Sequence, residues 1–256
     1  MPQWSLARRR SRRSTSPAFR AKRKIKGAGI PFRVPPAHLL PDRLAAVFGV
    51  IYLIFNEGWS GRNDLAREAI RLGQALVELM PDEPEAYGLL ALMLLHDSRS
   101  AARFRNGERV LLADQDQTLW NTDQIKSGKE ILDRALALHG RGAYVIQAAI
   151  AALHTERPRD WFQIVALYRE LLRLTDSAVV RLNHAIAVGE AYGPELGLRL
   201  VDQLELPEYR YFHSARAELL RRLGRTQDAR AAYTRALELT RDEAERRLLQ
   251  RRVSEL

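Results

Sequence analysis

The residues able to do acid–base or metal chemistry are few and widely spaced in this chain. No two histidines stand four residues apart, and no His-Glu-x-x-His zinc motif occurs. The chain has no cysteine, which excludes a thiol nucleophile, a zinc–thiolate site and a disulfide framework. A Gly-x-Ser-x-Gly elbow and a Walker phosphate loop are also missing. We therefore expect no enzyme activity, no cofactor and no bound metal. The six histidines are His38, His96, His139, His154, His184 and His213.

An acidic cluster at Asp82, Glu83 and Glu85 resembles a pair of catalytic carboxylates only at first sight. It stands at the start of a predicted helix, where negative side chains stabilise the positive end of the helix dipole. A role at the helix end is therefore the better interpretation.

A second polar run, at residues 114–116, lies within a predicted insertion that spans residues 97–122. The run lacks the glycine and the terminal glutamate of a calcium-binding loop. We expect its side chains to hydrogen-bond loop backbones while Trp120 packs on the helices. The dipeptide Asn106-Gly107 is a strong turn signal, and residues 109–112 are expected either to pair as a short hairpin or to lie across the repeats.

Two stretches have the spacing of the 34-residue tetratricopeptide (TPR) repeat, in which small residues let two helices approach closely. Residues 210–241 match best, with a glycine ending the first helix. Residues 68–94 match next, and there Leu76 and Leu79 are expected on an apolar face before Pro81 closes the turn. The pattern positions of the first stretch are Ala217, Leu220, Gly224, Ala229, Tyr233 and Ala236.

Weaker units occur at residues 128–138, 144–174 and 178–205, so we count about five helix pairs and a closing helix at residues 242–256. The sequence thus predicts an all-α fold, a right-handed array of TPR-like helix pairs. The array begins near Leu39 with an apolar helix that ends at Gly58. Further helices are predicted at residues 64–80, 84–96, 123–138, 142–154, 160–174, 178–191, 194–204, 210–223 and 226–240.

The net charge of +10 is concentrated at the N-terminus. Eleven of the 41 basic residues lie in residues 1–33, which contain no acid, and this leaves 30 basic beside 31 acidic residues in the remainder. Residues 1–19 are rich in Arg, Ser and Pro and are predicted to be disordered. The basic arm formed by the Lys and Arg residues of 1–33 could neutralise phosphates without reading bases. The alternative is a solvated tail or the remainder of a larger basic domain. The candidate nucleic-acid contacts are Arg20, Lys22, Arg23, Lys24 and Lys26.

Apolar runs are all shorter than the roughly 18 residues that a membrane-spanning helix needs. The basic N-terminus also lacks the apolar core of a signal peptide. We therefore expect a cytoplasmic protein that makes no contact with a membrane.

Several long segments, in this order, resemble one subfamily of extracytoplasmic-function (ECF) sigma factors, whose members carry a TPR-like C-terminal extension. The segments are AKRKIKGAGIPFRVP, DRLAAVFGVIYLIFNEGW, ELMPDEPEAYGLLALMLLHDSR, LLADQDQTLW, YVIQAAIAALH, VVRLNHAIAV and ARAELLRRLGR. The resemblance implies that residues 20–38 hold the end of a sigma-4 domain and a Gly/Pro linker, and that residues 39–256 form the extension. It also implies a bacterial protein that regulates transcription initiation by contacting RNA polymerase, sigma domains or another regulatory protein.

The sigma-2 domain and most of the sigma-4 domain of that family have no counterpart here, so promoter recognition does not carry over. We expect the chain to be a truncated form. Two alternatives stay open: a free-standing interaction scaffold and a nucleic-acid binder that uses the basic arm.

Helical repeats bind partners on a concave face. We expect partner contacts from polar residues on or beside that face, although each of them could instead satisfy a helix end. They are Asn56, Glu57, Arg99, Asp114, Gln115, Asp116 and Asn183.

Overall fold

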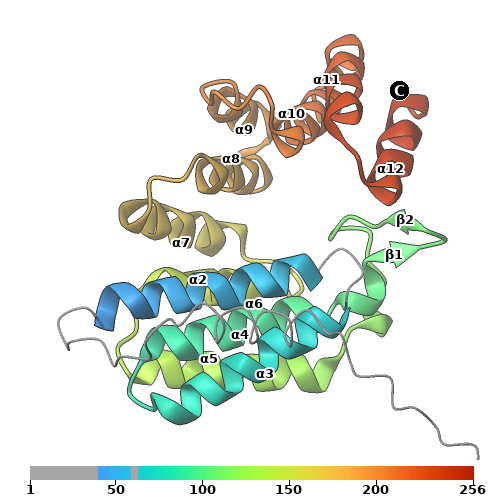
Figure 1. Cartoon of the computed structure of the whole chain (residues 1–256). Helices are drawn as coiled ribbons and strands as arrows, with labels where there is room; N and C mark the ends of the chain where they lie inside the picture. The colour runs from blue at the N-terminus through green and yellow to red at the C-terminus, as the bar shows by residue number, and fades with distance from the viewer. Residues whose placement is uncertain (1–39, 59–62) are drawn as a thin grey trace, which may run out of the picture. The chain divides into compact units, whose positions relative to one another are not determined.

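The computed structural model describes residues 40–58 and 63–256 (Figure 1). Contacts divide the chain into two units, residues 1–45 and residues 46–256. In the first unit only the start of one helix is described, and the second unit holds all the other helices. The segments expected to form the basic arm and the linker, residues 1–19 and 20–38, lie outside the described residues.

The described residues are almost all helical, which confirms the predicted all-α fold. Predicted and observed boundaries agree within two residues except for one helix, which ends at Val201 instead of residue 204. In chain order the helices are α2 (Leu40–Gly58), α3 (Asn63–Leu79), α4 (Pro84–Asp97), α5 (Thr122–Ala137), α6 (Ala143–Leu153), α7 (Trp161–Leu174), α8 (Ala178–Tyr192), α9 (Pro194–Val201), α10 (Arg210–Arg222), α11 (Thr226–Leu239) and α12 (Glu243–Ser254).

Side-chain caps fix where several helices begin. Asn121, Asp160 and Asp242 each accept a hydrogen bond from a backbone N–H in the first turn of α5, α7 and α12. Such caps satisfy donors that have no partner within the helix.

Helices that are close in sequence pack against each other, as in a repeat array. Helix α4 contacts both α5 and α6, while α7 packs on α8, α8 on α9, and α10 on α11. Three apolar clusters result: one from α4, α5 and α6, one from α6, α7 and α8, and one from α8 to α12. Because neighbouring clusters share a helix, each pair buries its apolar face against the next.

The predicted repeat positions lie in this core. Ala217, Leu220, Ala229 and Ala236 are fully buried, as is the ring of Tyr233 between α10 and α11. The prediction for Leu79 was wrong: it is 80% exposed because it is the last residue of α3, where the helix runs into solvent.

The insertion between α4 and α5 carries two short 3₁₀ helices, η2 (Ser100–Ala102) and η3 (Gln117–Leu119), and a hairpin of β1 (Phe104–Arg105) and β2 (Glu108–Arg109). Asn106 and Gly107 both have positive φ, at 54° and 75°. The predicted turn is therefore confirmed, with its strands slightly earlier in the sequence than predicted. Trp120 is buried, as expected.

The hairpin packs on the C-terminal helix α12 (Figure 1). Arg251 donates to Glu108 at 2.8 Å, and Arg252 donates to Asp114 at 3.3 Å. The insertion thus ties α4 to the other end of the chain. None of the helices in the described part is long and apolar enough to span a bilayer.

Candidate functional site

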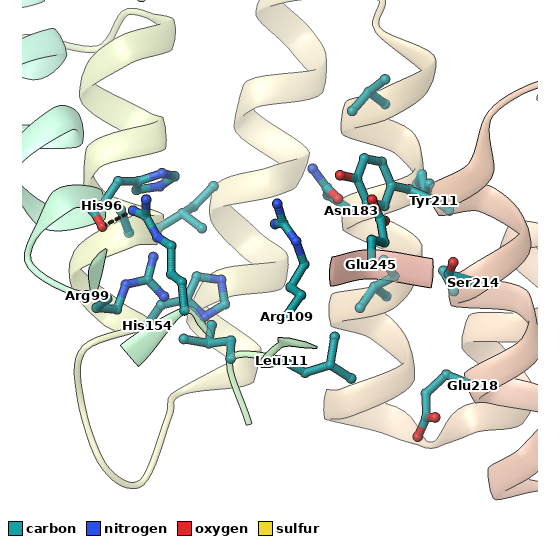
Figure 2. Close-up of a pocket in the computed structure, with 18 of the residues that line it drawn as sticks. His96, Arg99, Arg109, Leu111, His154, Asn183, Tyr211, Ser214, Glu218 and Glu245 are labelled. Atoms are coloured by element: carbon teal, nitrogen blue, oxygen red, sulfur yellow. Dashed lines mark hydrogen bonds between the residues drawn. The ribbon is translucent and has the colours of Figure 1, made fainter. Parts of the chain in front are cut away.

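A cavity of about 640 Å³ lies where the insertion, α4, α6, α7, α8, α10 and α12 meet. This volume is in the range of sites that hold small molecules. Its polar side chains are not spread evenly. Figure 2 shows His96, Arg99 and His154 on one side, Arg109 in the middle, and Asn183, Tyr211, Ser214, Glu218 and Glu245 on the other side.

The arginine end, as we call it here, is the side of the cavity formed by Arg99 and Arg103, together with Arg109, which reaches into the middle of the cavity. Arg99 and Arg103 follow the C-terminus of α4 and are only 6% and 8% exposed. Arg103 donates to the carbonyl of His96, the contact drawn as a dashed line in Figure 2. The Arg99 guanidinium lies over the ring of Trp120, 5.9 Å from its centre. The insertion and the end of α4 together hold these cations in place.

The arginine end is crowded with positive charge. Burial, together with Arg159 and Arg157, lowers the pKa of Arg99 to about 10. Burial and the Arg99 charge lower the pKa of Arg103 to about 9. Both groups remain cationic at neutral pH, but the folded protein holds each charge at a cost.

The two histidines beside these arginines are neutral. Burial lowers the pKa of His154 to about 3, with Arg99 and Arg159 adding to the effect. Burial lowers the pKa of His96 well below its usual value, and Arg99 and Arg103 act in the same direction. The positive charge of this end therefore resides on the guanidinium groups alone.

Arg99 and Arg109 have no acidic partner. Within the described part of the chain neither forms an ion pair, and the Nε of each is buried without a hydrogen-bond acceptor. The Arg109 guanidinium lies over the ring of Phe104, 5.6 Å from its centre. Each of the two guanidinium groups therefore has an N–H donor without an acceptor in this structure.

The opposite end carries carboxylates that are already paired. Glu218 accepts from the Tyr233 hydroxyl at 2.8 Å and from Arg221 at 2.6 Å and 3.0 Å. Burial raises the pKa of Glu218, but these hydrogen bonds outweigh it and the net pKa is lowered. Glu245 is 4% exposed and accepts from Arg210 at 3.0 Å. This end is therefore close to neutral.

Between the two ends, the wall is apolar and phenolic. Ile150, Leu182 and Ile186 line it. Tyr52 and Tyr168 also line it, and burial raises the pKa of each to about 12. These phenols stay neutral at any physiological pH.

The structure brings three of the predicted partner-contact residues, Arg99, Gln115 and Asn183, to the cavity wall. The side chain of Asn183 makes no hydrogen bond to any described residue, whereas Gln115 donates to the Val110 carbonyl at 3.3 Å. Asp114 and Asp116 do not line the cavity. Asp114 pairs with Arg252, and Asp116 caps η3 by accepting from the Thr118 N–H at 2.9 Å.

The other predicted positions lie away from the cavity. Asn56 and Glu57 are exposed near the end of α2 and do not line the cavity. The candidate nucleic-acid contacts Arg20, Lys22, Arg23, Lys24 and Lys26 are outside the described residues. No three His, Asp or Glu side chains among the described residues converge as metal ligands.

Sequence reasoning missed His154, Arg103, Arg109 and Glu245. Histidine spacing along the chain gave no signal because His96 and His154 come from different helices, α4 and α6. Both histidines are at the ends of predicted helices. This shared position is the one sequence feature that could have suggested that they lie close together.

Residues 43–136 match the family of unknown function DUF6596. This stretch runs from α2 into α5 and includes the whole arginine end.

One relative extends well beyond this chain. The uncharacterized protein R00370 of Rhizobium meliloti (strain 1021) is 48% identical over 240 residues, which are 88% of this chain and 57% of that protein. The chain therefore spans little more than half of that relative's length. Among solved structures, the crystal structure of TTC0263, a thermophilic TPR protein of Thermus thermophilus, is similar with a TM-score of 0.46. It is 19% identical, over 76% of this chain and 91% of that one.

Proposed function

We propose that this chain is the regulatory helical-repeat region of an ECF-type sigma factor. It acts in the cytoplasm on transcription initiation, through contacts with RNA polymerase or with sigma domains, and the cavity is its working site. The chain does no chemistry of its own in this proposal.

One observation carries the proposal. Six of the seven segments that resemble the ECF subfamily contribute side chains to the cavity, and the seventh lies outside the described residues. These segments come from α2, α4, the insertion, α6, α8 and α10, far apart in the sequence. If these segments were alike only because they pack helices together, we would not expect them all to line one cavity.

The length of the relative from Rhizobium meliloti supports the same view. Because this chain spans 57% of it, that protein has room for further domains. A regulatory region joined to such domains fits the sigma-factor resemblance.

The test is a direct binding measurement with purified components. The full chain is immobilised, and RNA polymerase core, a sigma-2 domain and a sigma-4 domain from the same bacterium are applied in turn after nuclease treatment. We expect at least one of them to bind with a Kd of about 1 μM or tighter.

Salt separates this result from contact through nucleic acid. Phosphate binding by the basic arm weakens steeply between about 50 mM and 200 mM salt, whereas an apolar protein contact changes little. Absence of binding to all three proteins would contradict the proposal, and binding that vanishes with salt would favour the nucleic-acid alternative.

A further inference from the structure

Arg99 is a buried cation that forms no ion pair with any described acidic side chain. Arg99 is nine-tenths buried and faces the cavity, yet its Nε has no acceptor. A buried cation with no counter-charge is costly, because the lost hydration is not replaced. Arg99 packs against Trp120, and Arg157 stacks on the same ring at 5.8 Å, which adds a second positive charge.

Three acidic side chains in this part of the protein are hydrogen-bonded to residues outside the arginine end. Asp97 accepts from Gln124 at 3.0 Å, Glu108 from Arg251 at 2.8 Å, and Glu190 from Arg222 at 2.7 Å. None of the three forms an ion pair with Arg99 or Arg109. The positive charges of Arg99 and Arg109 are therefore left without a negative partner in the described part of the folded chain.

We propose that the arginine end is a binding site for a small organic anion, whose carboxylate or phosphate group contacts Arg99 and Arg109. A guanidinium presents planar donors that match two oxygens of either group. Both side chains line the same cavity, and the Nε–H of each lacks a hydrogen-bond acceptor.

The remaining wall indicates the rest of the ligand. Ile150 and Leu182 favour an apolar body, and the phenol of Tyr168 favours an aromatic one. Glu218 and Glu245 at the far end disfavour a second anionic group there. The ligand class is thus an apolar or aromatic molecule with one anionic head. This inference goes beyond the proposed function, because it needs only the cavity, whichever protein the array contacts.

Three probes test the class by calorimetric titration of the full chain: phenyl phosphate, phenylacetate and the neutral 2-phenylethanol. We expect at least one of the two anions to bind with a Kd below about 1 mM, and the alcohol to bind at least tenfold more weakly. The two anionic arms show which head group the site prefers. Failure of both anions, or equal binding of the alcohol, would overturn the proposal.

Matched variants locate the site. Arg99→Gln is expected to weaken anion binding at least tenfold, whereas Arg141→Gln, at an exposed arginine outside the cavity, leaves it unchanged. Should Arg99→Gln fail to fold, Arg109→Gln on the half-exposed hairpin decides the point. Anion binding that survives both cavity substitutions would overturn the assignment.

A second readout separates binding from a purely structural role. Removing an unpaired buried charge stabilises the ligand-free protein, so Arg99→Gln is expected to raise the Tm without ligand while losing the anion-dependent rise. A lower Tm with full anion binding would show that Arg99 serves packing alone. Neither readout involves polymerase, so failure here is distinguishable from failure of the proposed function.

Discussion

At the scale of single residues, the cavity is distinguished by which charges have a partner. Arg252 pairs with Asp114 and Glu255, and Glu245 pairs with Arg210. Arg99 is 6% exposed and lies against the Trp120 ring, with no ion pair to a described residue. Arg252 and Glu245 are thus neutralised by partners, whereas Arg99 lines the cavity, where a ligand could reach it.

The buried His154, close to several arginines, makes the stability of the protein depend measurably on pH. Its pKa is about 3 in the folded protein, because of burial and the nearby Arg99, Arg159 and Arg157, against about 6.5 when unfolded. Between these values the unfolded chain binds a proton that the folded chain does not, so stability falls as pH falls. From pH 7 to pH 5 we expect His154 to contribute a loss of about 1–2 kcal/mol.

Urea unfolding at both pH values checks this prediction with two variants. His154→Gln should remove the share of His154, while the buried His96, whose pKa is also lowered well below its usual value, keeps its own share. His139→Asn is the control, since His139 is exposed with φ of 57°, which asparagine tolerates. An unchanged pH dependence in His154→Gln would contradict the account.

Only part of this residue-scale picture could be predicted from the sequence. Arg99 and Asn183 were expected as contacts because they are polar residues near helix ends and faces. His154 and Arg109 were not, since whether a side chain is left unpaired depends on neighbours far along the chain. Arg159, for instance, donates to the Leu112 carbonyl at 3.3 Å across 47 positions.

At the scale of helices, one carboxylate joins two elements. Glu85, in the first turn of α4, accepts from the Tyr144 N–H at 3.0 Å and the Val145 N–H at 3.1 Å, and so caps α6. The predicted role at a helix end is confirmed for Glu83, which caps α4 itself. Glu85 does the same for a helix almost 60 residues later.

Gly142 leaves room for this cap. A Cβ there would lie 2.3 Å from the Glu85 carboxyl carbon. Gly142→Ala should push the carboxylate off the backbone donors and destabilise the protein by about 1–2 kcal/mol, as should Glu85→Ala.

Chemical denaturation of both single variants and the double variant measures the coupling. The double variant should cost clearly less than the sum of the singles, since both remove the same cap. Gly49→Ala on α2, whose Cβ would meet nothing within 4 Å, should not destabilise. Additive costs would show that Gly142 and Glu85 act independently.

Helix positions were predictable because apolar periodicity and capping residues are local signals. The contact between the start of α4 and the start of α6 was not, because it depends on how the helices pack. The same limit applies to the hairpin: its turn follows from Asn106-Gly107, but its packing on α12 does not.

At the scale of residues 46–256, the insertion determines the shape of the cavity. It supplies the arginine end, and its ion pairs with α12 join segments more than 130 residues apart. The repeat pattern predicted the array of helix pairs. It could not predict the cavity, which forms where the insertion departs from the repeat.

The most direct test of the central claim is to fill the cavity. Asn183→Trp places a bulky side chain at its wall, and Gln163→Trp on the exposed face of α7 is the matched control. Both are compared with the unmodified chain for binding to the RNA polymerase or sigma component that the unmodified chain binds, with Tm measured alongside. If the cavity is the working site, Asn183→Trp loses at least about tenfold in affinity at a similar Tm, and Gln163→Trp does not. Full binding by Asn183→Trp would place the working surface elsewhere on the array.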